Sequence, residues 1–108
     1  MDSQTKKRLD ARVKVLKALA HPTRLFIVQE LARCEEKCVC ELTEMIGADM
    51  STVSRHLALL KNAKLIEDDK RGAQVFYRLR VRCILNFLDC VDGVLQEELH
   101  EQLNTLQS

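Results

Sequence analysis

Apolar side chains recur at steps of three and four residues along most of this 108-residue chain, and this spacing constrains the fold more than any other feature. It is the period of an amphipathic helix, whereas a half-buried strand shows strict alternation. Helix-breaking residues are rare, because the chain holds only three Gly and one Pro. With 46% hydrophobic and 31% charged residues, the composition indicates one mainly helical globular domain over residues 1–108.

The first half of the chain predicts two helices that meet at a proline. The first helix is predicted over about Thr5–Leu19. It ends at His21, because Pro22 disfavours helical backbone in the residue before it and suits the first turn of a new helix. The second helix is therefore predicted over about Pro22–Arg33.

Two further helices are predicted around a short turn. A third helix over about Val39–Ile46 ends at Gly47, which is well placed for a left-handed cap. After about three residues, Ser51 is a suitable N-cap for a fourth helix over Ser51–Lys64. The residues expected to face the core from this fourth helix are Val53, Leu57 and Leu60.

The rest of the chain predicts a β-hairpin followed by a long helix. Strands are expected over Leu65–Asp69 and Gln74–Leu79, joined by residues 70–73, where Gly72 supplies a positive φ. The last helix is predicted over about Val81–Leu106. Its apolar stripe runs beyond what so small a domain covers, so we expect it to pack against a second copy in a two-fold dimer. The stripe consists of Ile84, Leu88, Val91, Leu95, Leu99, Leu103 and Leu106.

This order of elements is that of a winged helix-turn-helix, with the helix-turn-helix over about 38–64, the wing over about 65–79 and the dimerisation helix over about 81–106. In such folds the helix after the turn lies in the major groove of double-stranded DNA. Arg55 is expected to reach a guanine edge, and Arg71 at the hairpin tip to contact the backbone or the minor groove. His56 lies at the edge of the apolar arc, which leaves partial burial and DNA contact both open. The remaining candidate DNA contacts are Ser51, Thr52 and Ser54.

The distribution of charge favours a polyanion-binding face, although the net charge is only +1. Residues 51–64 and 70–82 carry basic side chains and no acidic ones, whereas residues 34–50 and 83–108 are mainly acidic. Two basic stretches in the middle of the chain are typical of nucleic-acid binding. The alternative is that short charge runs form only a solvated surface.

The five cysteines are predicted to be free thiols in the cytoplasm. No apolar run is long enough to cross a bilayer and the first residues do not form a signal peptide, so no membrane association is expected. Cytosolic thiols stay reduced, which makes structural disulfides improbable there. The cysteines are then either buried core residues, or some of them bind a metal or sense the redox state.

Several motifs resemble the ArsR/SmtB family of metalloregulatory repressors. They are Ala18-Leu19-Ala20-His21-Pro22-Thr23-Arg24-Leu25, Cys38-Val39-Cys40-Glu41-Leu42, Ser51-Thr52-Val53-Ser54-Arg55-His56-Leu57-Ala58-Leu59-Leu60, and Gly72 followed by Val75-Phe76-Tyr77-Arg78-Leu79. The resemblance covers roughly residues 10–95. It implies a homodimeric winged-helix repressor that leaves its operator DNA when an effector binds, with the first and last helices forming the dimer interface.

The resemblance also implies which sensor site to expect. The zinc-responsive members carry Asp and His followed by His and Glu on the last helix, where this chain has Val81, Cys83, Val94 and Glu97, so only Glu97 matches. The arsenic-responsive members carry Cys-Val-Cys-Asp-Leu-Cys at the start of the third helix. This chain matches two of those thiols, Cys38 and Cys40, and has Thr43 at the third position.

Cys34 is the nearest candidate for the missing sulfur, so the predicted effector site is a Cys34/Cys38/Cys40 trithiolate for As(III). Thiolates also bind Cd(II) and Pb(II), and oxidants or persulfides are a further alternative. The helix N-terminus favours the thiolate form. Cys83 and Cys90 are expected mostly to pack, or else to pair with the other thiols or complete a metal site. No cofactor is expected to be required for folding.

Other function classes fit the sequence less well. A thiol oxidoreductase would show a Cys-x-x-Cys motif within a βαβ pattern, and neither is present, so no enzyme is predicted. A protein-interaction module that has lost DNA binding is the remaining alternative. Arg55, Arg71 and the acid-free stretches weigh against it, and salt-dependent duplex binding discriminates the two.

Overall fold

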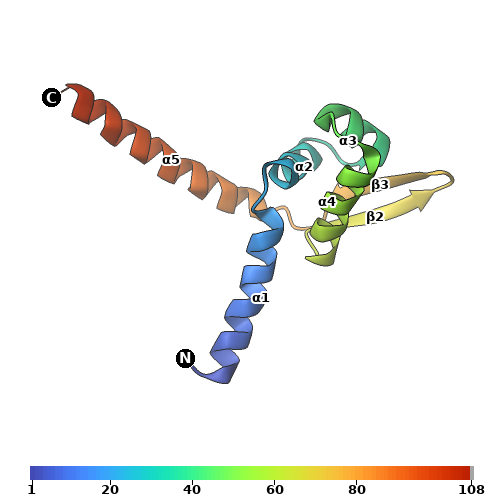
Figure 1. The fold of residues 1–108 in the computed structure, drawn as a ribbon, viewed down its shortest axis with the longest axis horizontal. Helices are drawn as coiled ribbons and strands as arrows, with labels where there is room; N and C mark the ends of the chain where they lie inside the picture. The colour runs from blue at the N-terminus through green and yellow to red at the C-terminus, as the bar shows by residue number, and fades with distance from the viewer. Residues whose placement is uncertain (108) are drawn as a thin grey trace.

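The computed structural model describes the backbone of residues 1–107 and the side chains of residues 1–105. The expected mainly helical winged helix-turn-helix is present, with a small antiparallel sheet on one side of the helices (Figure 1). The elements follow in the order α1 (Ser3–Leu19), α2 (Pro22–Arg33), β1 (Lys37–Cys38), α3 (Val39–Ile46), α4 (Met50–Asn62), β2 (Ile66–Arg71), β3 (Gln74–Leu79) and α5 (Ile84–Gln107).

The predicted bounds of α2 and α3 are confirmed, and capping explains them. The Nδ1 atom of His21 accepts a hydrogen bond from the Thr23 backbone N–H at 3.0 Å, while Pro22 occupies the first helical position. Gly47 ends α3 with φ 78° and donates its N–H to the Thr43 carbonyl. Proline at a helix start and a left-handed glycine at a helix end were the two signals available in the sequence.

The predicted N-cap of the fourth helix is wrong by two residues, because it is Asp49 and not Ser51, and the helix begins at Met50. The Asp49 carboxylate accepts a hydrogen bond from the Thr52 N–H at 3.0 Å, and the Ser51 hydroxyl donates to the same carboxylate at 3.3 Å. Aspartate caps helices as well as serine does, so residue type alone did not separate the two positions. The helix also ends at Asn62, before the predicted Lys64.

The core confirms which face of α4 points inward. Val53, Leu57 and Leu60 are fully buried, as predicted from their spacing. They pack into one cluster with residues of α2 and α3, and the largest fully buried partners are Ile27, Leu31 and Leu42. The side chains on the opposite face of α4 therefore point away from the body of the domain.

The sheet has one strand more than the sequence predicted. β2 and β3 pair antiparallel and are joined by Gly72-Ala73, with Gly72 at φ 62°, so the connection is shorter than the predicted residues 70–73. A first central residue with positive φ is what a type II′ hairpin turn uses. β1 pairs with the other side of β3, placing Cys38 opposite Phe76. Two residues are too few to show alternation, which is why β1 gave no signal.

α5 and α1 extend from the domain as two arms (Figure 1). The radius of gyration is 17.2 Å, against about 13 Å for a compact chain of about 100 residues. α5 begins at Ile84 and not at the predicted Val81, because residues 81–83 form a turn. Ile84 and Leu88 pack on the core, whereas Leu95 and Leu99 are each 57% exposed; the side chain of Leu106 lies outside the described residues. Within residues 1–107, no helix has the length and apolar content needed to span a membrane.

The end of α4 is a Schellman motif with a lysine at the left-handed position. The Lys64 N–H donates to the Lys61 carbonyl at 2.9 Å and the Leu65 N–H to the Leu60 carbonyl at 3.1 Å. Lys64 has φ 66°, a conformation usually taken by glycine at this point of the motif. A side chain there costs about 1–2 kcal/mol relative to right-handed backbone.

We therefore expect Lys64→Gly to raise the free energy of unfolding by about 0.5–1 kcal/mol, because relief of the left-handed strain exceeds the about 0.4–1 kcal/mol gained by the more flexible unfolded chain. Urea denaturation measures the change. The control Ala58→Gly, in the exposed middle of the same helix, should lower the free energy by about 1 kcal/mol. Equal destabilisation by both variants would contradict the strain argument.

Candidate nucleic-acid interface and thiol site

The outer face of α4 carries the predicted DNA contacts. Ser51, Ser54 and Arg55 are exposed, and Thr52 is half-buried. The sequence missed Asp49, which places a carboxylate at the helix N-terminus. Hydrogen bonds from Thr52 hold the pKa of Asp49 below its usual value, with smaller effects of Ser51 and the Arg55 charge. Arg55 is thus the exposed cation of this face, and the hydroxyl of Ser51 is engaged in the cap.

His56 lies toward α2, which favours the partly buried of its two predicted roles. Its ring lies 4.4 Å from the His21 ring, centroid to centroid, and its Nδ1 lies 3.2 Å from Nη1 of Arg24. Burial lowers the pKa of His56, and the positive charges of His21, Arg24 and Arg55 lower it further. Every charged neighbour in this set is a potential cation, so the site is one of positive potential.

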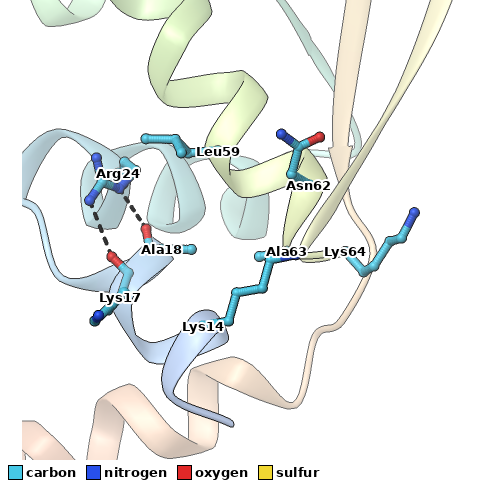
Figure 2. Close-up of a pocket in the computed structure, with 8 residues that line it drawn as sticks. All are labelled: Lys14, Lys17, Ala18, Arg24, Leu59, Asn62, Ala63 and Lys64. Atoms are coloured by element: carbon cyan, nitrogen blue, oxygen red, sulfur yellow. Dashed lines mark hydrogen bonds between the residues drawn. The ribbon is translucent and has the colours of Figure 1, made fainter. Parts of the chain in front are cut away.

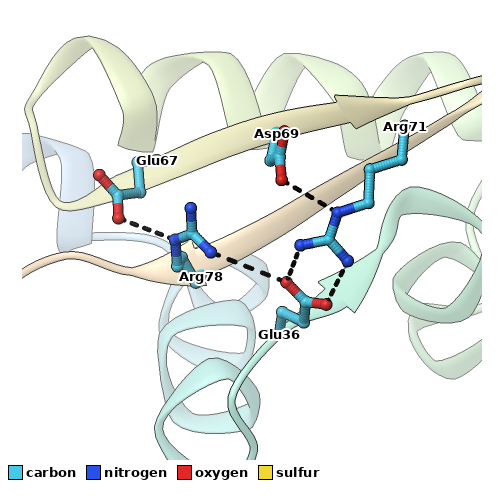
Figure 3. Close-up of polar contacts among 5 residues, drawn as sticks. All are labelled: Glu36, Glu67, Asp69, Arg71 and Arg78. Atoms are coloured by element: carbon cyan, nitrogen blue, oxygen red, sulfur yellow. Dashed lines mark hydrogen bonds and ion pairs between the residues drawn. The ribbon is translucent and has the colours of Figure 1, made fainter.

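The wing arginines are paired with carboxylates, although residues 70–82 contain no acidic residue. Arg71 donates to both Glu36 carboxylate oxygens, at 2.6 and 2.8 Å, and to Asp69 at 2.9 Å (Figure 3). Arg78 donates to Glu67 at 2.8 Å. The hydrogen bond from Arg71 lowers the pKa of Glu36, followed by the charges of Arg71 and Arg78.

These pairs correct the picture of a freely available cation at the hairpin tip. Residues 70–82 carry no acid, but antiparallel pairing sets β3 beside the acidic β2, with Glu67 opposite Arg78. Glu36 comes from the loop before β1. Charge counted along the chain overlooks such neighbours, although acidic residues 67–69 were a visible signal once the hairpin register was known.

The predicted thiols lie around the start of α3, in three different settings. Cys38 is the N-cap residue and only 5% exposed, whereas Cys40 is exposed in the first turn. Cys34 follows α2, and its thiol donates to the Glu30 carbonyl at 3.1 Å. The Cys38 N–H donates to Glu41 at 3.3 Å, and hydrogen bonding from Cys38, chiefly its side chain, lowers the pKa of Glu41.

The three thiols do not form a ready metal site. Among the described residues, no group of three or more His, Cys, Asp or Glu side chains is arranged to hold a metal ion. The Cys34 thiol already donates to the Glu30 carbonyl, so a trithiolate of Cys34, Cys38 and Cys40 requires it to leave that partner.

Thr43, at the position of the third family thiol, has a buried hydroxyl oxygen with no hydrogen-bond partner among the described residues. A buried hydroxyl without a partner is unfavourable, whereas a cysteine thiol tolerates an apolar site. The local environment on α3 therefore suits the sulfur that this chain lacks.

Cys83 and Cys90 are both exposed in the single chain, so neither packs in its core, and their expected packing beside the apolar stripe of α5 stays a prediction for the dimer. Cys83 precedes α5, whereas Cys90 lies within it. Cys83 borders an apolar groove between the end of α1 and the start of α5.

Comparison with known proteins places the chain among bacterial regulators. The family model described as "Bacterial regulatory protein, arsR family" matches residues 21–68. The arsenical resistance operon repressor of Escherichia coli is 43% identical over 67 residues, covering 62% of this chain and 57% of that protein. The arsenical resistance operon repressor of Bacillus subtilis is 35% identical over 99 residues, covering 92% of this chain and 88% of that protein.

The chain spans little more than half the length of several other relatives, 51% to 52%. Among solved structures, the homodimeric winged helix-turn-helix domain Mb0332 from Mycobacterium bovis superimposes with a TM-score of 0.78 at 29% identity, covering 94% of this chain and 93% of that one.

The two thiols of the Cys38-Val39-Cys40 segment should differ in reactivity. We expect iodoacetamide to modify Cys38 at least about tenfold more slowly than Cys40. The buried thiol reacts only after local opening, and an opening free energy of about 1.4 kcal/mol already lowers the reactive population tenfold. Mass spectrometry of the labelled peptides measures both rates. In urea-unfolded protein the two rates should converge. Similar rates in the folded protein would show that Cys38 is not buried in solution.

Proposed function

Because this chain belongs to the arsR family of bacterial regulatory proteins, we propose that it is a cytoplasmic transcriptional repressor that binds operator DNA as a homodimer and dissociates when a thiophilic ion binds its cysteines. One observation carries the proposal. The fully buried inner face of α4 fixes the direction in which its outer face points. The helix α3, which begins at Cys38 and Cys40, packs against that inner face.

The DNA-reading element is α4. Arg55 is exposed, and an arginine on a major-groove helix pairs bidentately with guanine. Ser51, Thr52 and Ser54 lie in the first turns of the same helix, where they contact phosphates or bases. His56 supports α4 through His21 and Arg24, and Arg71 contacts DNA only when it leaves Glu36 and Asp69.

The homodimer is supported by the two projecting helices. α1 has an exposed apolar stripe of Leu9, Val13 and Leu16, and α5 has a longer one. Their charges are opposite: residues 3–13 of α1 hold four basic residues and one acidic residue, whereas α5 holds five acidic residues and neither Lys nor Arg. Apolar stripes with complementary charges favour packing of each arm against the arms of a second copy.

The effector that the thiols suit best is As(III), with Cd(II) and Pb(II) as alternatives. All three are thiophilic, and trivalent arsenic takes three sulfurs. Cys38 and Cys40 supply two, and Cys34 at the end of α2 supplies the third after it leaves the Glu30 carbonyl. Two relatives bear names that refer to arsenical resistance, which supports the same class of ion.

Ion binding is coupled to DNA through the segment that carries these thiols. Drawing Cys34 and Cys38 together moves the start of α3, which packs against α4. It also moves β1, which pairs with β3 of the wing, and Glu36, which holds Arg71. Ion binding therefore displaces Arg55 of α4 and Arg71 of the wing. Thermodynamic linkage then requires DNA to weaken ion binding by the same factor.

Arsenite should weaken DNA binding by about 5- to 150-fold, which corresponds to a coupling free energy of about 1–3 kcal/mol. Fluorescence anisotropy with a duplex from upstream of the gene measures it. Cys38→Ser and Cys40→Ser should abolish the response, with Cys90→Ser as the control that retains it. In the Cys34→Ser background, Thr43→Cys should restore the response by supplying a third sulfur. Normal release by both single variants would refute the thiol mechanism.

Oxidants or persulfides are the second candidate signal, favoured by the exposed thiol of Cys40. Metal ligation produces ultraviolet thiolate-to-metal absorption, whereas oxidation produces mass shifts that a reductant reverses. Release of DNA by an oxidant, with neither absorption nor release upon arsenite addition, would assign the signal to redox chemistry.

Glu36→Gln should strengthen DNA binding at low salt, because it removes one of two carboxylate partners from Arg71 and from Arg78 and leaves Arg71 held by Asp69 alone. We expect the slope of log K against log salt concentration to steepen by about 0.9 for each protomer whose Arg71 gains a phosphate contact. The control Glu35→Gln removes the same charge from an exposed neighbour in the same loop. It should change the slope by less than about half as much as Glu36→Gln does. An identical slope in both variants would show that Arg71 does not reach DNA.

A further inference from the structure

A basic pocket lies between α1, the start of α2 and the C-terminal end of α4. Its volume is about 670 Å³, and it is lined by four cationic side chains, by Asn62 and by apolar residues, with no carboxylate in the lining. Lys14 reaches across from α1 toward the end of α4 at Ala63, while Arg24 and Lys64 lie at opposite ends (Figure 2). The cations are Lys14, Lys17, Arg24 and Lys64.

Arg24 is fixed in this pocket without being neutralised. Its Nε donates to the Ala18 carbonyl at 2.6 Å and its Nη2 to the Lys17 carbonyl at 3.2 Å, and its Nη1 lies beside His56. The two carbonyls and the His56 imidazole orient the guanidinium but carry no negative charge to neutralise it. Among the side chains of residues 1–105, none of the four cations forms an ion pair with a carboxylate, in contrast to Arg71 and Arg78 of the wing.

The pocket continues the exposed face of α4. Leu59 and Asn62 follow Arg55 at steps of four and three residues, so they lie on the same side of the helix. Both line the pocket. A duplex read by Arg55 therefore has the pocket beside it, at the end of the helix where the groove gives way to the backbone.

Lys64 lines the edge of the pocket from a left-handed backbone position that is less favourable for lysine than for glycine, with its side chain directed outward (Figure 2). Strained backbone positions are concentrated at binding sites, where the side chain placed by the strain is used.

We propose that this pocket binds a phosphate group of the DNA backbone that flanks the groove entered by α4. The proposal rests on the function proposed above, in which α4 reads DNA. Ammonium and guanidinium groups bind phosphate oxygens through charge-assisted hydrogen bonds, and such contacts fix the register of a protein on the duplex without reading its sequence. Arg55 then reads bases and the pocket sets how far along the groove α4 lies.

The test measures DNA affinity against salt concentration for the full chain, with a duplex from upstream of the gene and a scrambled duplex of equal length. We expect Lys14→Gln/Lys17→Gln to lower the slope of log K against log salt concentration by about 0.9 per pocket, about 1.8 for a dimer, and by the same amount on both duplexes. Arg8→Gln, which removes a charge from α1 outside the pocket, should leave the slope unchanged.

Lys64→Gly separates binding from folding. We expect this variant to be more resistant to urea than the wild type and yet to bind both duplexes several-fold more weakly, a combination that misfolding does not produce. Lys64→Gly with undiminished affinity for both duplexes would contradict a role of the lysine side chain.

The outcomes also distinguish this inference from the proposed function. If the wild type binds neither duplex at low salt, both fail. If it binds and the Lys14/Lys17 variant matches Arg8→Gln in slope, only the pocket proposal fails. Titration with inorganic pyrophosphate, followed by the amide resonances of Lys17 and Lys64, provides the last arm: saturation at micromolar concentration without a change in slope would assign the pocket to a free anion and overturn the backbone assignment.

Discussion

The burial of the inner face of α4 is the constraint on which the rest of the structure depends. Val53, Leu57 and Leu60 are fully enclosed, and a helix anchored by three such side chains has one orientation. Because that orientation is fixed, Arg55 faces outward, the end of α4 meets α1 to form the basic pocket, and the chain leaves the helix through Lys64 toward β2. The same burial makes α4 responsive to its neighbours, since α2 and α3 supply the opposing side of the cluster. A shift at the thiols of α3 reaches the exposed face only through these contacts.

The sequence was sufficient for features governed by local chemistry. Pro22 and Gly47 marked helix ends that the structure confirms, because each residue restricts its own backbone and its neighbour's. It was insufficient where two residues of equal capping ability compete, as with Asp49 and Ser51, and where pairing is non-local. β1 exists because Lys37 and Cys38 find an open edge of β3, and nothing within those two residues announces it. The projecting α5 was inferred correctly from its periodicity, but the turn over residues 81–83 was not separated from the helix.

The candidate site divides along the same line. The identities of Arg55, Cys38 and Cys40 were readable from pattern and resemblance, whereas their electrostatic surroundings were not. Arg71 was expected to contact DNA from a stretch that lacks acids, yet it pairs with Asp69, two residues earlier in its own strand, and with Glu36, 35 residues earlier in the chain. Conversely, nothing in the sequence of a charged helix marked Lys14 and Lys17 as binding residues. They become candidates only because the fold places Arg24 and Lys64 in the same pocket. Unneutralised charge is a property of the folded surface, and here it shifts the emphasis from the wing to the junction of α1 and α4.

The projecting α5 has a consequence for how much of the protein a cell must make. Val91, Leu95, Leu99 and Leu103 of its apolar stripe are 41–57% exposed within one chain, so in the proposed dimer a large part of the folding free energy comes from association. Stability then follows mass action, and each tenfold fall in protomer concentration removes about 1.4 kcal/mol from the balance in favour of the folded dimer. Scarce protomers are correspondingly open to proteolysis. Abundance, assembly and survival of the protein are in this way set by one helix.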